Sequence, residues 1–423
     1  MVCKSALVPF ANQTLHCSPI QMVIESKKEL ATLVSETVAL FLGRYGIKPA
    51  WIAVAPGRVN LIGDHVDYND GFVLPVAIEK YSVAVGAMTG SETTVSRVYS
   101  VQMDASFEFD SSATLTPTQS GWEEYIKGVV HGFQSLGTSI PPMQMMVNSS
   151  VPVGSGLSSS AALEVSIATL LASACNQPLD KKQTALLCQN AEIDFANVPC
   201  GAMDQFISVF GKDNHALLLD CRDLSFRQIP FDQSEVALLI INSNVSHQLG
   251  NSQYAIRRKR CESACQKLDI KSLRSLDMET LQTSREKLDQ LEFQRCKHVV
   301  SENARTISFA EHLQNKQWQL AGQLMFQSHD SLRDDYEVSC FELDVLVELA
   351  KKIGPSGGVY GSRMTGGGFG GSTVSLVKRE LVESIARRIV EQYEVDSRIQ
   401  QQATAFYTSP VTGARLLENV TQC

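Results

Sequence analysis

The glycine- and serine-rich segment PVGSGLSSSAA, residues 152–162, constrains the fold of this chain more than any other stretch. Glycines let the backbone curl so that successive amide groups point inward, and serines are good residues to start a helix. An apolar stretch continues to about Ala174, so we expect a turn that opens a long buried helix. Helix N-terminal amides carry partial positive charge, so the segment favours phosphate binding, although an ordinary capped turn would use similar residues. It matches neither a Walker A loop nor a dinucleotide-binding fingerprint.

A second segment, GRVNLIGDHVDYNDGFVLP at residues 57–75, combines an arginine, a histidine and several acids with glycines. Carboxylates accept hydrogen bonds from hydroxyl groups, and histidine can donate or accept, so the segment suits a sugar, although acid-rich surface turns are also common. Two weaker segments are MTGGGFGG at residues 364–371, which would let backbone approach a ligand, and CGAMDQF at residues 200–206, where Asp204 is expected in a loop.

The length of 423 residues favours two domains, and the formal net charge of −8 argues against a partner that is nucleic acid or an anionic membrane. No apolar run reaches transmembrane length, and the short apolar stretch near the start is broken by Pro9, so we expect no signal peptide. The 11 cysteines show no zinc spacing and read as reduced thiols. We therefore expect a cytoplasmic protein that binds neither nucleic acid nor membrane.

Hydrophobic periodicity predicts an α+β chain of two closely packed halves without internal repeats. Residues 1–24 are expected to form a flexible N-terminal extension, residues 25–215 a first domain and residues 216–423 a second domain. The expected helices cover residues 26–45, 124–135, 158–174, 181–195, 252–268, 297–314, 317–328, 341–352 and 379–393. The expected strands cover residues 51–55, 71–78, 143–147, 215–220, 236–241 and 403–407, with a meandering antiparallel sheet from residue 82 to residue 110.

The glycine-rich segments, in this order and at these distances, resemble the GHMP kinases and, within them, the galactokinases. The segment at residues 57–75 resembles the galactokinase signature, PVGSGLSSSAA the phosphate loop, and GSRMTGGGFGG the third motif. Linking stretches such as AEIDFANVPCGAMDQFIS, INSNVSHQLGNSQYAIRRKRCE and SHDSLRDDYEVSC are similar too, so the resemblance spans about residues 25–415. It implies an N-terminal α/β domain and a C-terminal α+β domain with the active site between them.

The resemblance also implies an activity, in which the γ-phosphate of ATP is transferred to the anomeric hydroxyl of galactose, and roles for individual residues. Asp204 falls at the position of the catalytic aspartate, and Arg58 at that of its partner arginine. The positions that contact the sugar are Arg58, Asp64, His65, Asp67, Gly201, Asp204 and Tyr254. The positions that bind ATP are Trp122, Gly154, Ser155, Gly156, Leu157, Ser158, Ser159 and Ser160. Mg²⁺, the implied cofactor, would be held by Ser160 and Glu192.

The sequence departs from the family pattern at Asp64, where most members have glutamate. The shorter side chain predicts a water-bridged contact to the terminal hydroxymethyl of the sugar. Two other functions stay open: a galactose and ATP sensor without activity, against which the intact phosphate loop argues, and a kinase for N-acetylgalactosamine or galacturonate. The role of Asp204, as a general base or as an orienting group, stays open as well. We expect galactose and ATP as partners and a monomer or weak homodimer.

Overall fold

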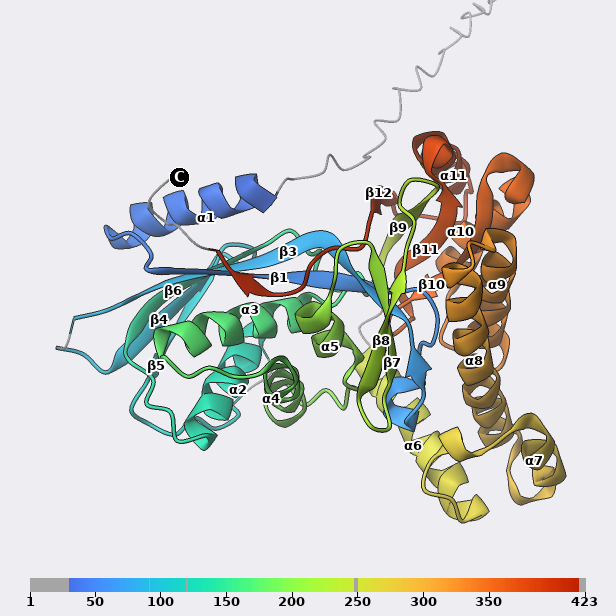
Figure 1. The fold of residues 1–423 in the computed structure, drawn as a ribbon, viewed down its shortest axis with the longest axis horizontal. Helices are drawn as coiled ribbons and strands as arrows, with labels where there is room; N and C mark the ends of the chain where they lie inside the picture. Colours follow the sequence, from blue (N-terminus) through green and yellow to red (C-terminus); the bar gives the residue numbers. More distant parts are fainter. Residues whose placement is uncertain (1–29, 91, 119–120, 247–249, 418–423) are drawn as a thin grey trace, which may run out of the picture.

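The protein, described here by a computed structural model, is built around three antiparallel or mixed sheets (Figure 1). The structure describes residues 30–90, 92–118, 121–246 and 250–417. The predicted N-terminal extension and the first four residues of the helix predicted at residues 26–45 lie outside these ranges.

The first sheet has six strands in the order β13-β1-β3-β6-β4-β5 and carries the phosphate-loop helix on one face (Figure 1). Its strands are β1 (Trp51–Asn60), β3 (Pro75–Met88), β4 (Val95–Ser100), β5 (Ala105–Asp110), β6 (Met143–Ser149) and β13 (Arg415–Leu416). Helix α1 (Leu30–Tyr45) packs on β3 and β6 through Leu33, Val34 and Phe41, whose spacing buries one stripe of the helix. The opposite face is covered by α2 (Trp122–Ser135), α3 (Ser159–Ala174), α4 (Lys181–Asp194) and α5 (Met203–Phe210).

The other strand pairs of the first sheet are antiparallel, but β4 pairs in parallel with β6, with Val98 opposite Met145. The sequence predicted a simple meander from residue 82 to residue 110, and that prediction is wrong on this point. A parallel pair needs a long crossover connection, and here β5 and α2 lie between the two strands in the chain.

The second sheet has four strands in the order β10-β11-β9-β12 and belongs to the second half of the chain. Its strands are β9 (Val236–Ser246), β10 (Val359–Thr365), β11 (Gly370–Lys378) and β12 (Thr404–Thr408). The helices of this half are α6 (Gly250–Leu268), α7 (Met278–Thr283), α8 (Gln290–Gln314), α9 (Trp318–Asp334), α10 (Phe341–Ile353) and α11 (Val382–Glu394). Helices α10 and α11 cover one face through a cluster that includes Leu346, Ile385 and Tyr393, and α9 packs on β10.

A small third sheet joins the two halves: β2 (Phe72–Val73) pairs with β7 (His215–Asp220), which pairs with β8 (Ser225–Pro230). The chain also returns at its end, where β13 pairs with β1 so that Leu416 lies opposite Ala53. The second half of the chain therefore supplies a strand to the first sheet, and the predicted domain boundary near residue 215 stays a prediction. Within the described residues, no helix has both the length and the apolarity that a membrane span needs.

Candidate active site

The predicted site residues meet in one cavity of about 430 Å³, a volume typical of small-molecule sites. Three glycine-rich segments form its walls: the turn before α3, the loop between β1 and β2, and the loop between β10 and β11. With the exception of Ser155, which is buried, every site residue that the family resemblance implies borders this cavity. These residues are Arg58, Asp64, His65, Asp67, Trp122, Gly154, Gly156, Leu157, Ser158, Ser159, Ser160, Glu192, Gly201, Asp204 and Tyr254.

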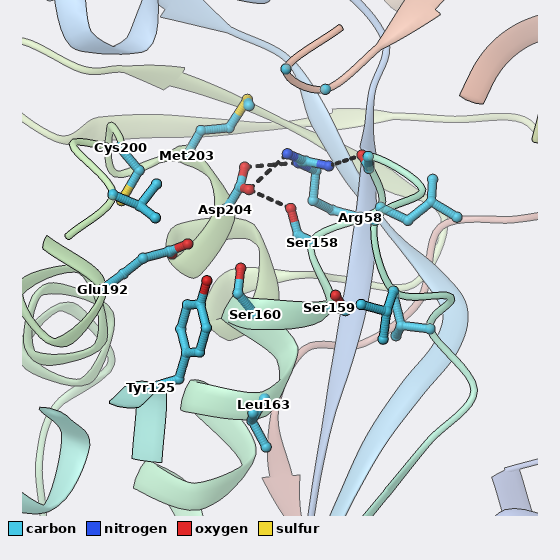
Figure 2. Close-up of a pocket in the computed structure, with 18 of the residues that line it drawn as sticks. Arg58, Tyr125, Ser158, Ser159, Ser160, Leu163, Glu192, Cys200, Met203 and Asp204 are labelled. Carbon is cyan, nitrogen blue, oxygen red and sulfur yellow. Dashed lines mark hydrogen bonds and ion pairs between the residues drawn. The ribbon is translucent and has the colours of Figure 1, made fainter. Parts of the chain in front are cut away.

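An ion pair between Arg58 and Asp204 lies at the centre of the cavity (Figure 2). Arg58 donates from Nε to Oδ1 at 2.8 Å and from Nη2 to Oδ2 at 2.7 Å, the two-pronged geometry that fixes a carboxylate in orientation. The arginine is 6% exposed and the aspartate 23%, so the carboxylate is the partner that faces the cavity. Ser158 also donates its hydroxyl hydrogen bond to Oδ2 of Asp204.

Asp204 lies in the first turn of helix α5 rather than in a loop, so the loop prediction is wrong. The helix begins at Met203, shortly after Pro199 and Gly201, and these two helix breakers make an eight-residue helix hard to predict from hydrophobic periodicity. A carboxylate in the first turn is stabilised by the helix dipole, and the helix gives the side chain a fixed direction.

The phosphate loop is held by two neighbouring segments. Arg58 donates from Nη1 to the carbonyl oxygen of Gly156 at 2.5 Å, and Ser372 donates its hydroxyl to the carbonyl oxygen of Ser155 at 2.8 Å. Gly156 and Gly366 pack so closely that a Cβ on Gly366 would lie 2.7 Å from the Gly156 carbonyl oxygen. The loop ends at Ser158, which has a φ of 59°, and α3 then starts with Ser159 and Ser160, which border the cavity; the first amide groups of a helix have no partner within it. Such a helix start is suited to phosphate oxygens.

Glu192 and Ser160 extend toward the same space as Asp204 (Figure 2). Burial, followed by the negative charge of Asp204, raises the pKa of Glu192 to about 7, and the Ser160 hydroxyl acts in the opposite direction. Carboxylate and hydroxyl oxygens are ligands that Mg²⁺ accepts, and a cation would relieve the repulsion between the two carboxylates. No group of three or more histidine, cysteine or acidic side chains in the described ranges could hold a metal alone. The two residues therefore fit an ion that keeps water and phosphate oxygens as its other ligands.

Two buried side chains that the sequence reasoning missed support Glu192. Gln205 donates from Nε2 to Oε2 of Glu192 at 2.6 Å and to Oε2 of Glu164 at 3.0 Å. Glu164 is fully buried, and this burial, with the nearby Glu192, raises its pKa well above the ordinary value. The sequence did contain a signal for this contact, because Glu164 is a charged residue within the apolar stretch of α3 and a buried acid needs a specific partner.

Asp64 is held by the C-terminal half of the chain. Its Oδ2 accepts from Nη1 of Arg363 at 2.5 Å, and its Oδ1 accepts from the amide of Gly366 at 3.2 Å. Arg363 is fully buried and also donates to the carbonyl oxygen of Asn60 at 3.0 Å and to the hydroxyl of Ser328 at 3.1 Å. Arg363 lies in the third motif but was not singled out in the sequence. Its signal was an arginine three residues before a glycine run, in a segment expected to be strand-like and close to the site, where a buried arginine needs an anionic partner.

The other residues that were predicted to contact the sugar pack against one another. Burial raises the pKa of Asp67 to about 7, and the charge of Asp204 adds to this effect. A Cβ on Gly201 would collide with the carboxylate of Asp67, so glycine is required there. The ring of Tyr254 lies 5.4 Å from that of His65, measured between centroids, and borders the same cavity.

Trp122 also borders the cavity, at the start of α2, with its ring edge-on to Phe107 at 5.3 Å between centroids. Val147, Val151, Val153 and Leu163 border the cavity as well. Aromatic and aliphatic surface of this kind suits a flat heterocycle such as adenine.

Comparisons with known proteins agree with this arrangement. Models of the GHMP kinases N terminal domain, the galactokinase galactose-binding signature and the GHMP kinases C terminal domain match residues 124–212, 39–88 and 309–395. The galactokinase of Canis lupus familiaris is 41% identical over 94% of this chain and 100% of its own length. That of Homo sapiens is 41% identical over 92% of this chain and 98% of its own length.

A solved structure of Lactococcus lactis galactokinase complexed with galactose superposes with a TM-score of 0.84 at 30% identity, covering 91% of this chain and 100% of that one. These matches confirm the fold and the family that the three glycine-rich segments predicted. The chain belongs to the galactokinase family of GHMP kinases.

Proposed function

We propose that this chain transfers the γ-phosphoryl group of ATP to the anomeric hydroxyl of D-galactose, which gives α-D-galactose 1-phosphate and ADP. The observation that carries the proposal is the Arg58–Asp204 pair, placed between the phosphate loop and a pocket of hydrogen-bonding side chains. Phosphoryl transfer needs mainly positioning and charge stabilisation, and this arrangement supplies both.

Asp204 would accept the hydrogen of the anomeric hydroxyl. Its carboxylate already accepts hydrogen bonds from Arg58 and Ser158, and its exposed side faces the cavity, so a sugar hydroxyl can be the further donor. As a general base it would take the proton during transfer, and as an orienting group it would direct the oxygen lone pair at the phosphorus. Arg58 would keep the carboxylate in place and face the negative charge that develops on the phosphoryl group.

Ser160 and Glu192 would hold Mg²⁺, with Gln205 fixing the direction of the Glu192 carboxylate. When bound, the ion supplies charge neutralisation to the phosphate oxygens. The amides at the start of α3 and the loop from Gly154 to Ser160 would surround the phosphates, and the apolar end near Trp122 would hold adenine.

The sugar would lie among Arg58, Asp64, His65, Asp67, Gly201, Asp204 and Tyr254. Buried polar groups that are matched to sugar hydroxyls reject an epimer, because one of these groups is then left unpaired. We also infer a cytoplasmic enzyme that acts as a monomer or weak homodimer, on the composition and thiol content of the chain.

A phosphorylation screen tests the proposal. The purified enzyme is given ATP and Mg²⁺ with galactose, N-acetylgalactosamine, galacturonate, glucose or mevalonate, and ADP release is measured in a coupled assay. We expect turnover with galactose and none of note with glucose. Comparable rates for both epimers would contradict the proposal, preference for N-acetylgalactosamine or galacturonate would redirect it to a related sugar kinase, and binding without turnover would indicate a sensor.

A further inference from the structure

Three side chains, of which Tyr336 and Cys261 are buried and Tyr68 partly buried, continue from His65 in a chain of hydrogen bonds. His65 Nδ1 lies 2.9 Å from the hydroxyl oxygen of Tyr68, which lies 2.9 Å from the hydroxyl oxygen of Tyr336. The sulfur of Cys261, a free thiol, lies 3.3 Å from that same Tyr336 oxygen. We call Tyr68, Tyr336 and Cys261 the tyrosine chain.

The other ring nitrogen of His65 decides where its proton lies. Nε2 is 3.2 Å from the carbonyl oxygen of Gly367, and a carbonyl oxygen can only accept. Burial, with the nearby His298, lowers the pKa of His65 to about 3, so the imidazole carries one proton at neutral pH. That proton must therefore be on Nε2, and Nδ1 must be an acceptor.

This assignment fixes the direction of every further bond, because each hydroxyl has a single hydrogen. Tyr68 donates to Nδ1, so its oxygen accepts from Tyr336. Tyr336 has then used its own hydrogen, so its oxygen accepts from the Cys261 thiol. The reverse direction would place Nδ1–H against Tyr68 and leave Nε2 without a hydrogen against the Gly367 carbonyl, which is two acceptors in contact.

The chain is rigid because its members come from separate elements that are packed together. Tyr68 follows β1, Cys261 lies on α6 and Tyr336 follows α9. Arg257 fixes the Tyr336 segment by donating to the carbonyl oxygens of Tyr336 at 2.9 Å and Glu337 at 2.7 Å. His65 itself has a φ of 64°, a conformation that costs a residue with a side chain and is found most often at functional sites.

We propose that Tyr68 and Tyr336 are positioning residues that hold His65 with its hydrogen on Nε2, so that the imidazole presents a fixed N–H donor at the sugar pocket. The inference rests on the proposed galactose site. It adds that the sugar oxygen facing His65 accepts a hydrogen bond and gives its own hydrogen to another acceptor. Gly367, the present acceptor, borders the same cavity, so the N–H is close to the space where a sugar would lie.

Nitrogen NMR of the sugar-free enzyme tests the tautomer directly. With ¹⁵N-labelled histidine, the two ring-nitrogen shifts report which nitrogen carries the proton, and a His65→Gln variant assigns the signal. We expect the Nε2–H form alone in the wild-type enzyme. In Tyr68→Phe, Nδ1 loses its donor while Nε2 still faces the Gly367 carbonyl, so we expect the Nδ1–H tautomer to appear beside the Nε2–H form.

The affinity for galactose, measured by calorimetry, is a second readout, and we expect the loss of affinity to differ between the variants. Loss of the Tyr68 donor leaves a buried acceptor unpaired, so Tyr68→Phe should weaken binding by about tenfold or more. Tyr336→Phe keeps the Tyr68 hydrogen for Nδ1, so the tautomer should persist and binding should weaken by about threefold. Cys261→Ser should bind as the wild type does, because it keeps a donor at the end of the chain.

Tyr393→Phe is the matched control, since Tyr393 is a buried tyrosine of helix α11 whose hydroxyl has no partner among the described residues. It should change neither readout. A wild-type His65 with its proton on Nδ1 would overturn the inference. It would also be overturned if Tyr68→Phe and Tyr336→Phe both folded and both kept the wild-type tautomer and the wild-type affinity for galactose. A wild-type enzyme with the Nε2–H tautomer but no galactose binding would instead overturn the proposed function, because the tautomer is read without sugar.

Discussion

The carboxylate of Asp204 receives hydrogen bonds from two residues, and its proposed role depends on its charge as well as on its shape. Arg58 supplies two of these bonds and Ser158 the third. Lysine in place of Arg58 would keep the positive charge but could not repeat the planar two-pronged contact. The two residues therefore act as one unit, and substitutions in them should not be additive.

The Asp204→Asn substitution removes the charge and keeps the shape. We expect kcat to fall by about 100- to 10,000-fold, the usual contribution of a positioned base, while calorimetry shows that galactose still binds. Arg58→Lys should also be impaired, and the double variant should lose less than the sum of the two effects. A kcat near the wild-type value in Asp204→Asn would remove the aspartate from the chemistry, and an early thermal transition in both variants would make the pair structural.

Asp67 should make stability depend on pH. Its pKa is about 7 in the folded enzyme and near 3.8 when unfolded, so between these values the folded state holds a proton that the unfolded state releases. Its contribution to stability is therefore fully present below about pH 4 and is lost as the pH rises to about 7. An asparagine side chain at this position cannot ionise, so the difference in unfolding free energy, Asp67→Asn minus wild type, should become more positive from about pH 5 to about pH 8. Denaturant titrations of both proteins at each pH measure it, and a difference independent of pH would refute the assignment.

Among the elements, α9 and β10 are in contact at backbone distance. Gly322 lies in α9 against the carbonyl oxygen of Tyr360, and the reciprocal glycine of β10, Gly361, packs on Gly322. This contact brings β10, and with it Arg363, against the helix that carries Ser328. The arginine that holds Asp64 thus depends on a helix-to-strand distance that only glycine permits.

The Gly322→Ala substitution should destabilise the enzyme by about 2 kcal/mol or more, because the added methyl group overlaps main chain that cannot move away easily. Gly43→Ala in α1 is the matched control, since no atom lies within 4 Å of its added Cβ. In an exposed helix that change should stabilise by about 0.5–1 kcal/mol through helix propensity alone. Urea unfolding of the two variants gives the comparison, and equal effects would show that the contact between α9 and β10 is not tight.

Elements with strong periodicity were predicted well from the sequence, and elements defined by distant contacts were not. The helix predicted at residues 26–45 agrees with α1 over its described residues 30–45, where an apolar stripe marks it, and the helix predicted at residues 181–195 agrees with α4. Helix α5 was not predicted because a proline and a glycine lie shortly before it in the sequence. Strand β13 was not predicted because it is only two residues long and is defined by its pairing with β1. At the site, motif residues were found, whereas Arg363, Gln205 and Tyr336 were not, because their roles come from partners far away in sequence.

At the scale of the whole molecule, residues 411–417 form a strap that returns to the first sheet and to α5 (Figure 1). The amide of Leu417 donates to the carbonyl oxygen of Ile52 at 2.9 Å, and that of Ala414 to the carbonyl oxygen of Ser208 in α5 at 2.8 Å. A Cβ on Gly413 would lie 2.5 Å from the Val209 carbonyl oxygen, so the strap packs directly on the helix that carries Asp204.

A chain that ends after Pro410 should therefore lose both stability and activity. The β1 edge and the end of α5 would lose their backbone partners, and each unpaired buried group costs about 1–3 kcal/mol. We expect a clearly lower thermal midpoint by circular dichroism and a lower kcat, whereas a chain that ends after Leu417 should match the full sequence. A truncated chain with the wild-type midpoint and kcat would show that the strap is dispensable.

The return of the strap also sets an order of events during synthesis on the ribosome. Strand β1 and helix α5 leave the ribosome early, but their last backbone partners are made some two hundred residues after α5. A nascent chain therefore exposes an unpaired edge of β1 until residues 415–417 have been translated. Asp204, the proposed catalytic residue, is positioned only after that step, so we expect an incomplete product of translation to lack kinase activity.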